Sequence, residues 1–172
     1  MKNLILLRHA KSSWKNINID DHDRPLNKRG MRAAPIMGQR LSIKKKQPEL
    51  IISSPARRAY NTSKIVAKLI GYPVIRILKD STLYHASSEQ IQSIISQSDD
   101  KYDCVMIVGH NPGITILCNH LLKKSYHIDN IPTTGMVTFN LDIQYWQQIL
   151  EPNKEIKLID YDYPKLASII KK

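Results

Sequence analysis

Short apolar runs alternate with helix-like segments along this chain, and the alternation restricts the folds open to it. Six runs have the apolar character and length of strands: residues 3–7, 50–53, 74–78, 104–108, 136–141 and 156–161. Four intervening segments have helical character: residues 26–41, 55–70, 88–96 and 112–122. Strands that alternate with helices favour an α/β fold with a mostly parallel central sheet and helices on both faces.

Local signals sharpen some helix boundaries. Asn27 is a good cap for the helix predicted over 26–41, whereas Pro35 should kink that helix or move its boundary. Gly71 should end the helix predicted over 55–70. The chain contains no internal repeat, linker or low-complexity segment, so we expect residues 1–172 to form a single catalytic domain.

The charge balance raises the question of a nucleic-acid partner. The chain has 26 Lys and Arg residues against 15 Asp and Glu residues, a formal charge of +11. The basic residues fall into scattered groups such as Lys44 to Lys46, and only 6% of residues are aromatic, which leaves few rings for base stacking. We expect no nucleic-acid partner, although a basic surface can steer an anionic substrate.

The expected compartment follows from features that the sequence lacks. A membrane-spanning helix needs about 20 consecutive apolar residues, and the apolar run over residues 4–7 is also too short for a signal-peptide core. Cys104 and Cys118 lie in apolar surroundings and are expected to be reduced core residues. We therefore expect a cytoplasmic protein without a membrane partner. The sequence leaves the oligomeric state open, with a monomer favoured.

Basic side chains follow three of the predicted strands directly. Arg8 and His9 follow the first strand, Arg57 and Arg58 come shortly after the second, and His110 follows the strand over 104–108. Ligands bind beyond the carboxyl ends of the strands in open α/β sheets. These side chains should therefore meet at one rim of the sheet.

The arginine pair lies where a helix disfavours cations. Ser54 is a good N-cap and Pro55 suits a first helical position, so Arg57 and Arg58 belong to the opening turn. The helix dipole opposes positive charge at this end, and a phosphate would supply the compensating anion. A carboxylate from elsewhere in the fold would do the same, and the local sequence does not separate the two.

Two histidines at equivalent strand ends indicate phosphoryl chemistry. Asn111 and Pro112 can open a helix that fixes His110 above its N-terminus, while His9 lies beside Arg8. A neutral imidazole can attack phosphorus and carry the phosphoryl group, and arginines stabilise its charge. Zinc is the second reading of a histidine pair, but nearby arginines make a cation site unfavourable.

Four segments resemble signatures of one enzyme family, the histidine phosphatase superfamily, whose fold is phosphoglycerate mutase-like. They are LLRHAKS over 6–12, DHDRPL over 21–26, SSPARRAYNT over 53–62 and VGHNPG over 108–113. Alanine replaces the usual glycine after His9. The RHAKS form and the Arg24-Pro25-Leu26 step are similar to the SixA-like branch, which includes phosphohistidine phosphatases.

The resemblance implies a role for each matching residue. His9 would be the nucleophile that becomes phosphohistidine, and His110 would stabilise the transition state; Arg8 and Arg58 share the catalytic work. The phosphoryl group would be bound by Arg8, Arg24, Arg58 and, through a hydroxyl or backbone N–H, Thr134. The family pattern selects Arg58 rather than Arg57. It implies neither a metal nor an organic cofactor.

The general acid of larger relatives has no clear counterpart. Those enzymes carry a glutamate after the third strand, where this chain reads LYHASSE over 83–89 and Glu89 fits the first turn of a helix. Asp21 is a possible proton donor, or it pairs with Arg24. A missing acid fits a phosphoramidate, whose leaving group needs little help, better than an alkyl phosphate.

Three functions remain to be separated. The leading expectation is hydrolysis of phosphohistidine on a protein partner. The second is a phosphomonoesterase for a small phosphorylated metabolite, and the third is a phosphate-binding module without turnover. A mutase is less favoured, because the chain lacks the insertions that enclose a bisphosphate.

Overall fold

The computed structural model, which describes residues 1–123, 126–152 and 154–166, has one six-stranded sheet in the order β3-β2-β4-β1-β5-β6. The strands are β1 (Lys2–Arg8), β2 (Leu50–Ser53), β3 (Leu78–Lys79), β4 (Cys104–Gly109), β5 (Met136–Leu141) and β6 (Ile156–Asp162). Strands β1 to β4 are mutually parallel, whereas β5 runs antiparallel to both β1 and β6. The predicted α/β single-domain class with a mostly parallel sheet is confirmed.

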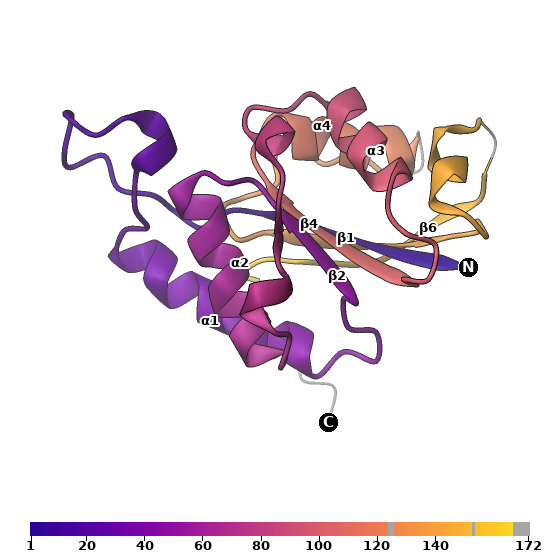
Figure 1. Cartoon of the computed structure of the whole chain (residues 1–172), viewed down its shortest axis with the longest axis horizontal. Helices are drawn as coiled ribbons and strands as arrows, with labels where there is room; N and C mark the ends of the chain where they lie inside the picture. The colour runs from indigo at the N-terminus through magenta and orange to yellow at the C-terminus, as the bar shows by residue number, and fades with distance from the viewer. Residues whose placement is uncertain (124–125, 153, 167–172) are drawn as a thin grey trace.

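Two helices cover each face of the sheet (Figure 1). They are α1 (Lys28–Ser42), α2 (Arg57–Leu69), α3 (Ser88–Ser96) and α4 (Gly113–Leu122), and short 3-10 helices span Asp21–Asp23, Val74–Arg76, Ser81–Leu83 and Trp146–Leu150. Alternate side chains of β1 separate the two halves of the core. Leu4 and Leu6 pack with α3 and α4, while Ile5 and Leu7 pack with α1 and α2. Because β1, β2 and β4 are parallel, their carboxyl ends share one rim of the sheet.

Helix α1 shows one confirmed signal and one that the fold overrides. The Asn27 side chain accepts a hydrogen bond from the Gly30 backbone N–H and caps the helix as predicted. Pro35 lies inside α1, which continues to Ser42, so this proline does not move the boundary. Burial of Met37 and Leu41 against the sheet holds the second half of the helix in place despite the missing N–H.

Two predicted helix starts are wrong. Helix α2 begins at Arg57, and its N-cap is Ala56 without a side-chain cap; Ser54 and Pro55 precede it. Helix α4 begins at Gly113 after an N-cap at Pro112, again without a side-chain cap. Before α2, the Ser54 hydroxyl lies 2.8 Å from His110 Nε2. Before α4, the Asn111 side chain donates to the Asn130 side-chain oxygen at 2.7 Å and to the Ile131 carbonyl at 3.1 Å.

The strand predicted over 74–78 is also wrong. Residues Val74–Arg76 form a 3-10 helix after Pro73, and the strand is reduced to Leu78–Lys79. Ile75 is 93% exposed and Leu78 is 54% exposed, so this edge has little packing to stabilise an extended strand.

The predictions for the end of α2 and for the two cysteines hold. Helix α2 ends at Leu69, just before Gly71, whose φ of +72° suits glycine. Cys104 and Cys118 are free and buried, and burial raises the pKa of both thiols, that of Cys104 to about 12. No helix in the described ranges has the length and apolar character to span a bilayer.

Candidate active site

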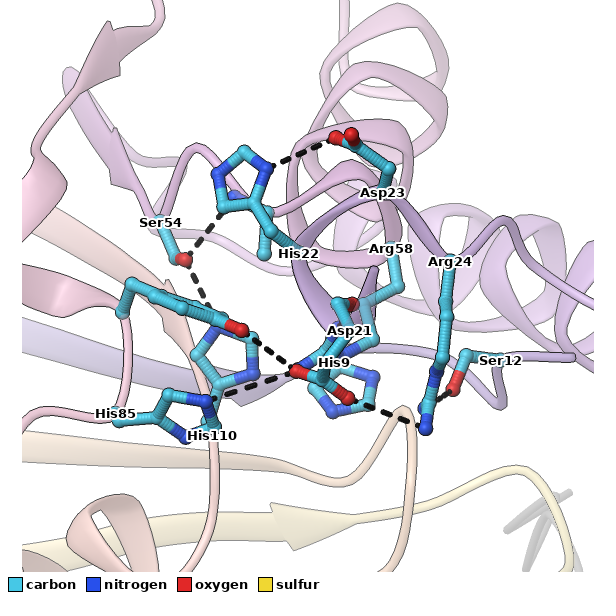
Figure 2. Close-up of polar contacts among 12 residues, drawn as sticks. His9, Ser12, Asp21, His22, Asp23, Arg24, Ser54, Arg58, His85 and His110 are labelled. Atoms are coloured by element: carbon cyan, nitrogen blue, oxygen red, sulfur yellow. Dashed lines mark hydrogen bonds and ion pairs between the residues drawn. The ribbon is translucent and has the colours of Figure 1, made fainter. Parts of the chain in front are cut away.

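The parallel strands bring the two predicted histidines together at one rim. Arg8 pairs in register with Gly109, and the His9 N–H donates to the Gly109 carbonyl at 3.0 Å. The imidazole rings of His9 and His110 lie with centroids 5.0 Å apart (Figure 2). The Ser54 N–H donates to the Val108 carbonyl at 2.9 Å, which aligns the loop before α2 with the same rim. The topology therefore assembles the site from three strand ends.

His9 has the tautomer of a nucleophile. Its Nδ1 lies 2.8 Å from the Ala10 carbonyl, which accepts a hydrogen bond only from a protonated Nδ1. Nε2 therefore carries the lone pair. Burial lowers the pKa of His9 to about 4, and the positive charges of Arg58, Arg8 and Arg24 add to this effect. The ring is neutral at physiological pH.

His110 is fixed from behind by Ser54. Its Nε2 lies 2.8 Å from the Ser54 hydroxyl, so this serine orients the His110 ring instead of capping α2. Its Nδ1 is buried and has no hydrogen-bond partner in the described part of the chain. Burial lowers the pKa of His110 to about 2, assisted by the neighbouring His9 and Arg58. One nitrogen is thereby held and the other is left for a ligand.

Asp21 connects two of the three arginines. Arg58 donates to both the carbonyl and the carboxylate Oδ2 of Asp21, the latter at 2.8 Å, and Arg24 lies 3.2 Å from Oδ1 (Figure 2). Arg58 and Arg24 are buried, with 3% and 6% exposure. Two buried guanidinium groups near each other repel, and the shared carboxylate offsets this repulsion.

The third arginine is held by a different element. Arg8 donates to the Ile131 carbonyl at 2.6 Å and lies 3.4 Å from the Asn130 side-chain oxygen. The Nε atoms of Arg8, Arg24 and Arg58 are all buried without a hydrogen-bond partner among the described residues. Buried donors of this kind need an acceptor, and phosphoryl oxygens match guanidinium geometry. The donor set therefore fits a phosphoryl group.

The comparisons with known proteins agree with this geometry. The sequence model of the histidine phosphatase superfamily (branch 1) matches residues 4–84. The solved structure of the putative phosphohistidine phosphatase SixA from Agrobacterium tumefaciens has a TM-score of 0.79 and 28% identity, covering 95% of this chain and 98% of that one. Over residues 4–84 the chain is thus similar to the histidine phosphatase superfamily. Over 95% of its length it shares the fold of this SixA structure.

Curated relatives extend the comparison. An uncharacterised chloroplastic protein of Arabidopsis thaliana is 38% identical over 120 residues, which cover 65% of this chain and 55% of that protein. Phosphoserine phosphatase 1 of Hydrogenobacter thermophilus is 35% identical over 78 residues, 44% of this chain and 36% of that enzyme. This chain thus spans about half or less of both relatives.

For Asp21, the contacts in the structure favour pairing over proton donation. Burial raises its pKa, but hydrogen bonds from Tyr84 and Arg58 and the charges of Arg58 and Arg24 outweigh burial, so the pKa is lowered. A carboxylate that is ionised and bound on both oxygens is a poor proton donor. The Arg24 pairing that the sequence left open is present.

Thr134 lies behind the cavity. Its side chain is fully buried, and its backbone N–H donates to the carbonyls of Arg8 and His9 at 3.1 and 3.2 Å. Its Oγ1 has no partner in the described residues, and its φ is +66°. Thr133, the preceding residue, lines the catalytic cavity. The backbone N–H of Thr134 is thus engaged, and a phosphate contact through its hydroxyl stays a prediction.

Sequence reasoning missed several residues around the cavity, which has a volume of about 230 Å³. The Tyr84 hydroxyl donates to Asp21 Oδ2 at 2.7 Å, and His85 Nε2 lies 3.6 Å from the same oxygen. Arg24 donates to the Ser12 hydroxyl, and its Cζ atom lies 3.3 Å from the centroid of the Trp14 ring. The RHAKS segment contains Ser12, but no local pattern indicates that residues 14 and 84 approach the site.

Two further points from the sequence concern Glu89 and a metal site. Glu89 lies in the first turn of α3 as predicted and is absent from the cavity lining. Within the described ranges, no three His, Cys, Asp or Glu side chains are grouped so as to hold a metal ion. The groups that line the cavity are mainly cationic or neutral, a set that favours anions.

Proposed function

We propose that this histidine phosphatase hydrolyses phosphohistidine on a protein partner through a phosphoenzyme intermediate at His9. The pair of neutral imidazoles 5.0 Å apart, surrounded by Arg8, Arg24 and Arg58, carries the proposal. His9 Nε2 attacks phosphorus while the bond from phosphorus to the substrate imidazole breaks. The departing nitrogen takes a proton from water. The hydroxide that remains attacks the phosphoryl group on His9, releases inorganic phosphate and regenerates the neutral ring, which has kept its Nδ1–H throughout.

The arginines and His110 supply charge stabilisation in both steps. Positioned donors around a transferring phosphoryl group are usually the largest contribution to its catalysis. His110 Nδ1 is placed to donate a hydrogen bond to an oxygen of that group once its proton is on this nitrogen, with Nε2 accepting from Ser54. Neither histidine needs to change charge to begin the reaction.

The substrate preference follows from the groups beside the leaving atom. The only carboxylate among the described residues that line the cavity is Asp21, and its lowered pKa keeps it ionised. An alkyl phosphate needs a proton donor for its leaving oxygen, whereas the imidazole of phosphohistidine is a leaving group that needs little help from a general acid. The structural neighbour from Agrobacterium tumefaciens, named as a putative phosphohistidine phosphatase, supports the same substrate.

A small phosphorylated metabolite is the second candidate. The similarity to a phosphoserine phosphatase over 78 residues favours it. The cytoplasmic location and the monomeric state that we expect from the sequence accompany either substrate. Both remain part of the proposal.

The test compares kcat/KM for a histidine peptide phosphorylated with phosphoramidate and for phosphoserine, p-nitrophenyl phosphate and sugar phosphates. We expect a preference of at least about 100-fold for the phosphohistidine peptide. His9→Gln should abolish turnover, and His127→Gln, at an exposed histidine, serves as the matched control. A preference for one ester would support the metabolite phosphatase instead. Binding of inorganic phosphate without turnover of any substrate would support the binding module.

A further inference from the structure

A second and larger cavity adjoins the catalytic one. Its volume is about 630 Å³, against about 230 Å³ for the catalytic cavity, and both are lined by Lys11 and Thr133. We name this second cavity the basic groove. Five cationic residues line it: Lys11, Lys28, Arg29, Arg32 and Lys165. A molecule bound at His9 that extends past Lys11 and Thr133 therefore enters the basic groove.

The rest of the lining is apolar or nearly so. Ile36, Pro132 and Pro164 are among these residues, and the described lining includes no carboxylate. Ile36 is 38% exposed, which is high for a large apolar side chain. The groove thus combines an apolar surface with a cationic border.

Among the described residues, the five cations of the groove form no ion pair with a carboxylate. Within the described residues, no carboxylate lies within ion-pair distance of any of the five, although ion pairs occur elsewhere on the surface. Helix α1 shows the contrast along its own length. Arg40 in its last turn pairs with Asp162 at 2.6 Å, whereas its first turn has no acidic residue to balance Lys28 and Arg29. In the described part of the chain, no acidic side chain therefore balances the positive charge at the groove end of α1.

We propose that the basic groove docks an acidic and partly apolar face of the phosphohistidine-bearing protein. This inference rests on the proposed function and names the surface chemistry of its substrate. A metabolite with one further anionic group would pair with one or two of the cations. Five cations from three separate segments match several carboxylates spread over a protein face, and the apolar lining matches the side chains between them.

The continuity of the two cavities explains how docking aids the reaction. The catalytic cavity is small and mostly polar, so it can grip a phosphoryl group but offers little surface to distinguish one protein from another. The basic groove supplies that surface at a fixed offset from His9. Complementary charge also raises the association rate, and added salt should reduce this benefit.

The test uses two phosphohistidine peptides that differ only in flanking residues, one with Glu and Leu and one with Gln and Leu. The wild type should favour the acidic peptide by about tenfold in kcat/KM. The variant Arg29→Ser with Arg32→Ser should hydrolyse both peptides with about the same kcat/KM. A tenfold preference corresponds to the free energy of two exposed ion pairs of moderate strength, which this variant cannot form. Lys45→Ser with Lys46→Ser removes the same charge beyond the other end of α1 and should keep the preference.

Several outcomes overturn the inference. The first is that the wild type hydrolyses both peptides equally. The second is that the Lys45 and Lys46 variant loses the preference as much as the Arg29 and Arg32 variant does, which would show only a long-range charge effect. The third is that the Arg29 and Arg32 variant loses activity toward a small bisphosphate but keeps its preference for the acidic peptide. The groove would then serve a metabolite.

Anisotropy of the labelled, unphosphorylated acidic peptide separates this inference from the proposed function. We expect binding that weakens in the Arg29 and Arg32 variant by about the same factor. Binding that depends on the groove without any His9-dependent hydrolysis contradicts the proposed function alone. Hydrolysis without preferential binding of the acidic peptide contradicts the groove alone.

Discussion

The catalytic cavity and the basic groove both gather positive charge, but they hold it in different ways. Arg24 and Arg58 are buried and joined through Asp21, whereas Arg29 and Arg32 are exposed and have no carboxylate partner in the described residues. Buried and cross-linked groups hold a fixed geometry, which transition-state stabilisation requires. Exposed side chains can adapt to different partners. The same charge thus serves chemistry in one region and recognition in the other.

The largest expected effect concerns a buried arginine and its exposed neighbour. Arg58→Ala should lower kcat/KM by about 100- to 1,000-fold, because it removes a fixed donor to the phosphoryl oxygens. Arg57→Ala, one residue earlier at an exposed position, should change kcat/KM less than about twofold. Steady-state kinetics on the phosphohistidine peptide checks both. Similar losses in the two variants would erase the contrast between fixed and adaptable charge.

Removal of the cross-link should have a smaller effect. Asp21→Asn keeps the shape of the side chain but loses the charge that balances Arg24 and Arg58, so we expect about a tenfold loss of kcat/KM. The loss should be the same for aryl phosphates with good and poor leaving groups. A loss that grows as the leaving group becomes more basic would identify Asp21 as a proton donor. Asp23→Asn, at the neighbouring exposed carboxylate, is the control.

The smallest effect concerns acid stability. In the folded state the pKa of His9 is lowered to about 4 and that of His110 to about 2, whereas the pKa of a histidine in the unfolded chain is about 6.5. Between pH about 6.5 and about 4 the unfolded chain binds more protons, so the unfolding free energy decreases as the pH falls. Urea unfolding at pH 7 and pH 5 measures this loss. His110→Asn should reduce it; an unchanged loss would contradict neutral burial of the ring.

The strand ends of the site were predictable from sequence for a physical reason. Buried parallel strands are short apolar runs, and topology requires that their carboxyl ends share a rim, so His9 and His110 could be placed together without coordinates. The apolar run over 74–78 shows the limit of this reasoning. An edge segment with exposed Ile75 lacks the packing that makes an apolar run a strand.

The remaining parts depend on contacts between distant segments. Ser54 has the sequence context of a helix cap, yet its hydroxyl bonds His110, 56 residues away along the chain. Tyr84 reaches Asp21 across 63 residues, from a loop without periodicity. A single sequence shows which side chains can form hydrogen bonds, but it does not show which of several possible partners each side chain bonds in the fold. The resemblance to a family compensated for this at Arg24 and Arg58, because its motifs record contacts that local physics does not predict.

The most direct test of the account is to find where phosphorus goes during turnover. The enzyme is mixed with the phosphohistidine peptide for milliseconds and quenched into alkaline denaturant, in which phosphohistidine survives, and the phosphorylated residue is located by mass spectrometry. The account predicts a transient phosphoryl group on His9 that is absent in His9→Gln. Turnover without a phosphoenzyme, or with the phosphoryl group on His110 or His85, would contradict it.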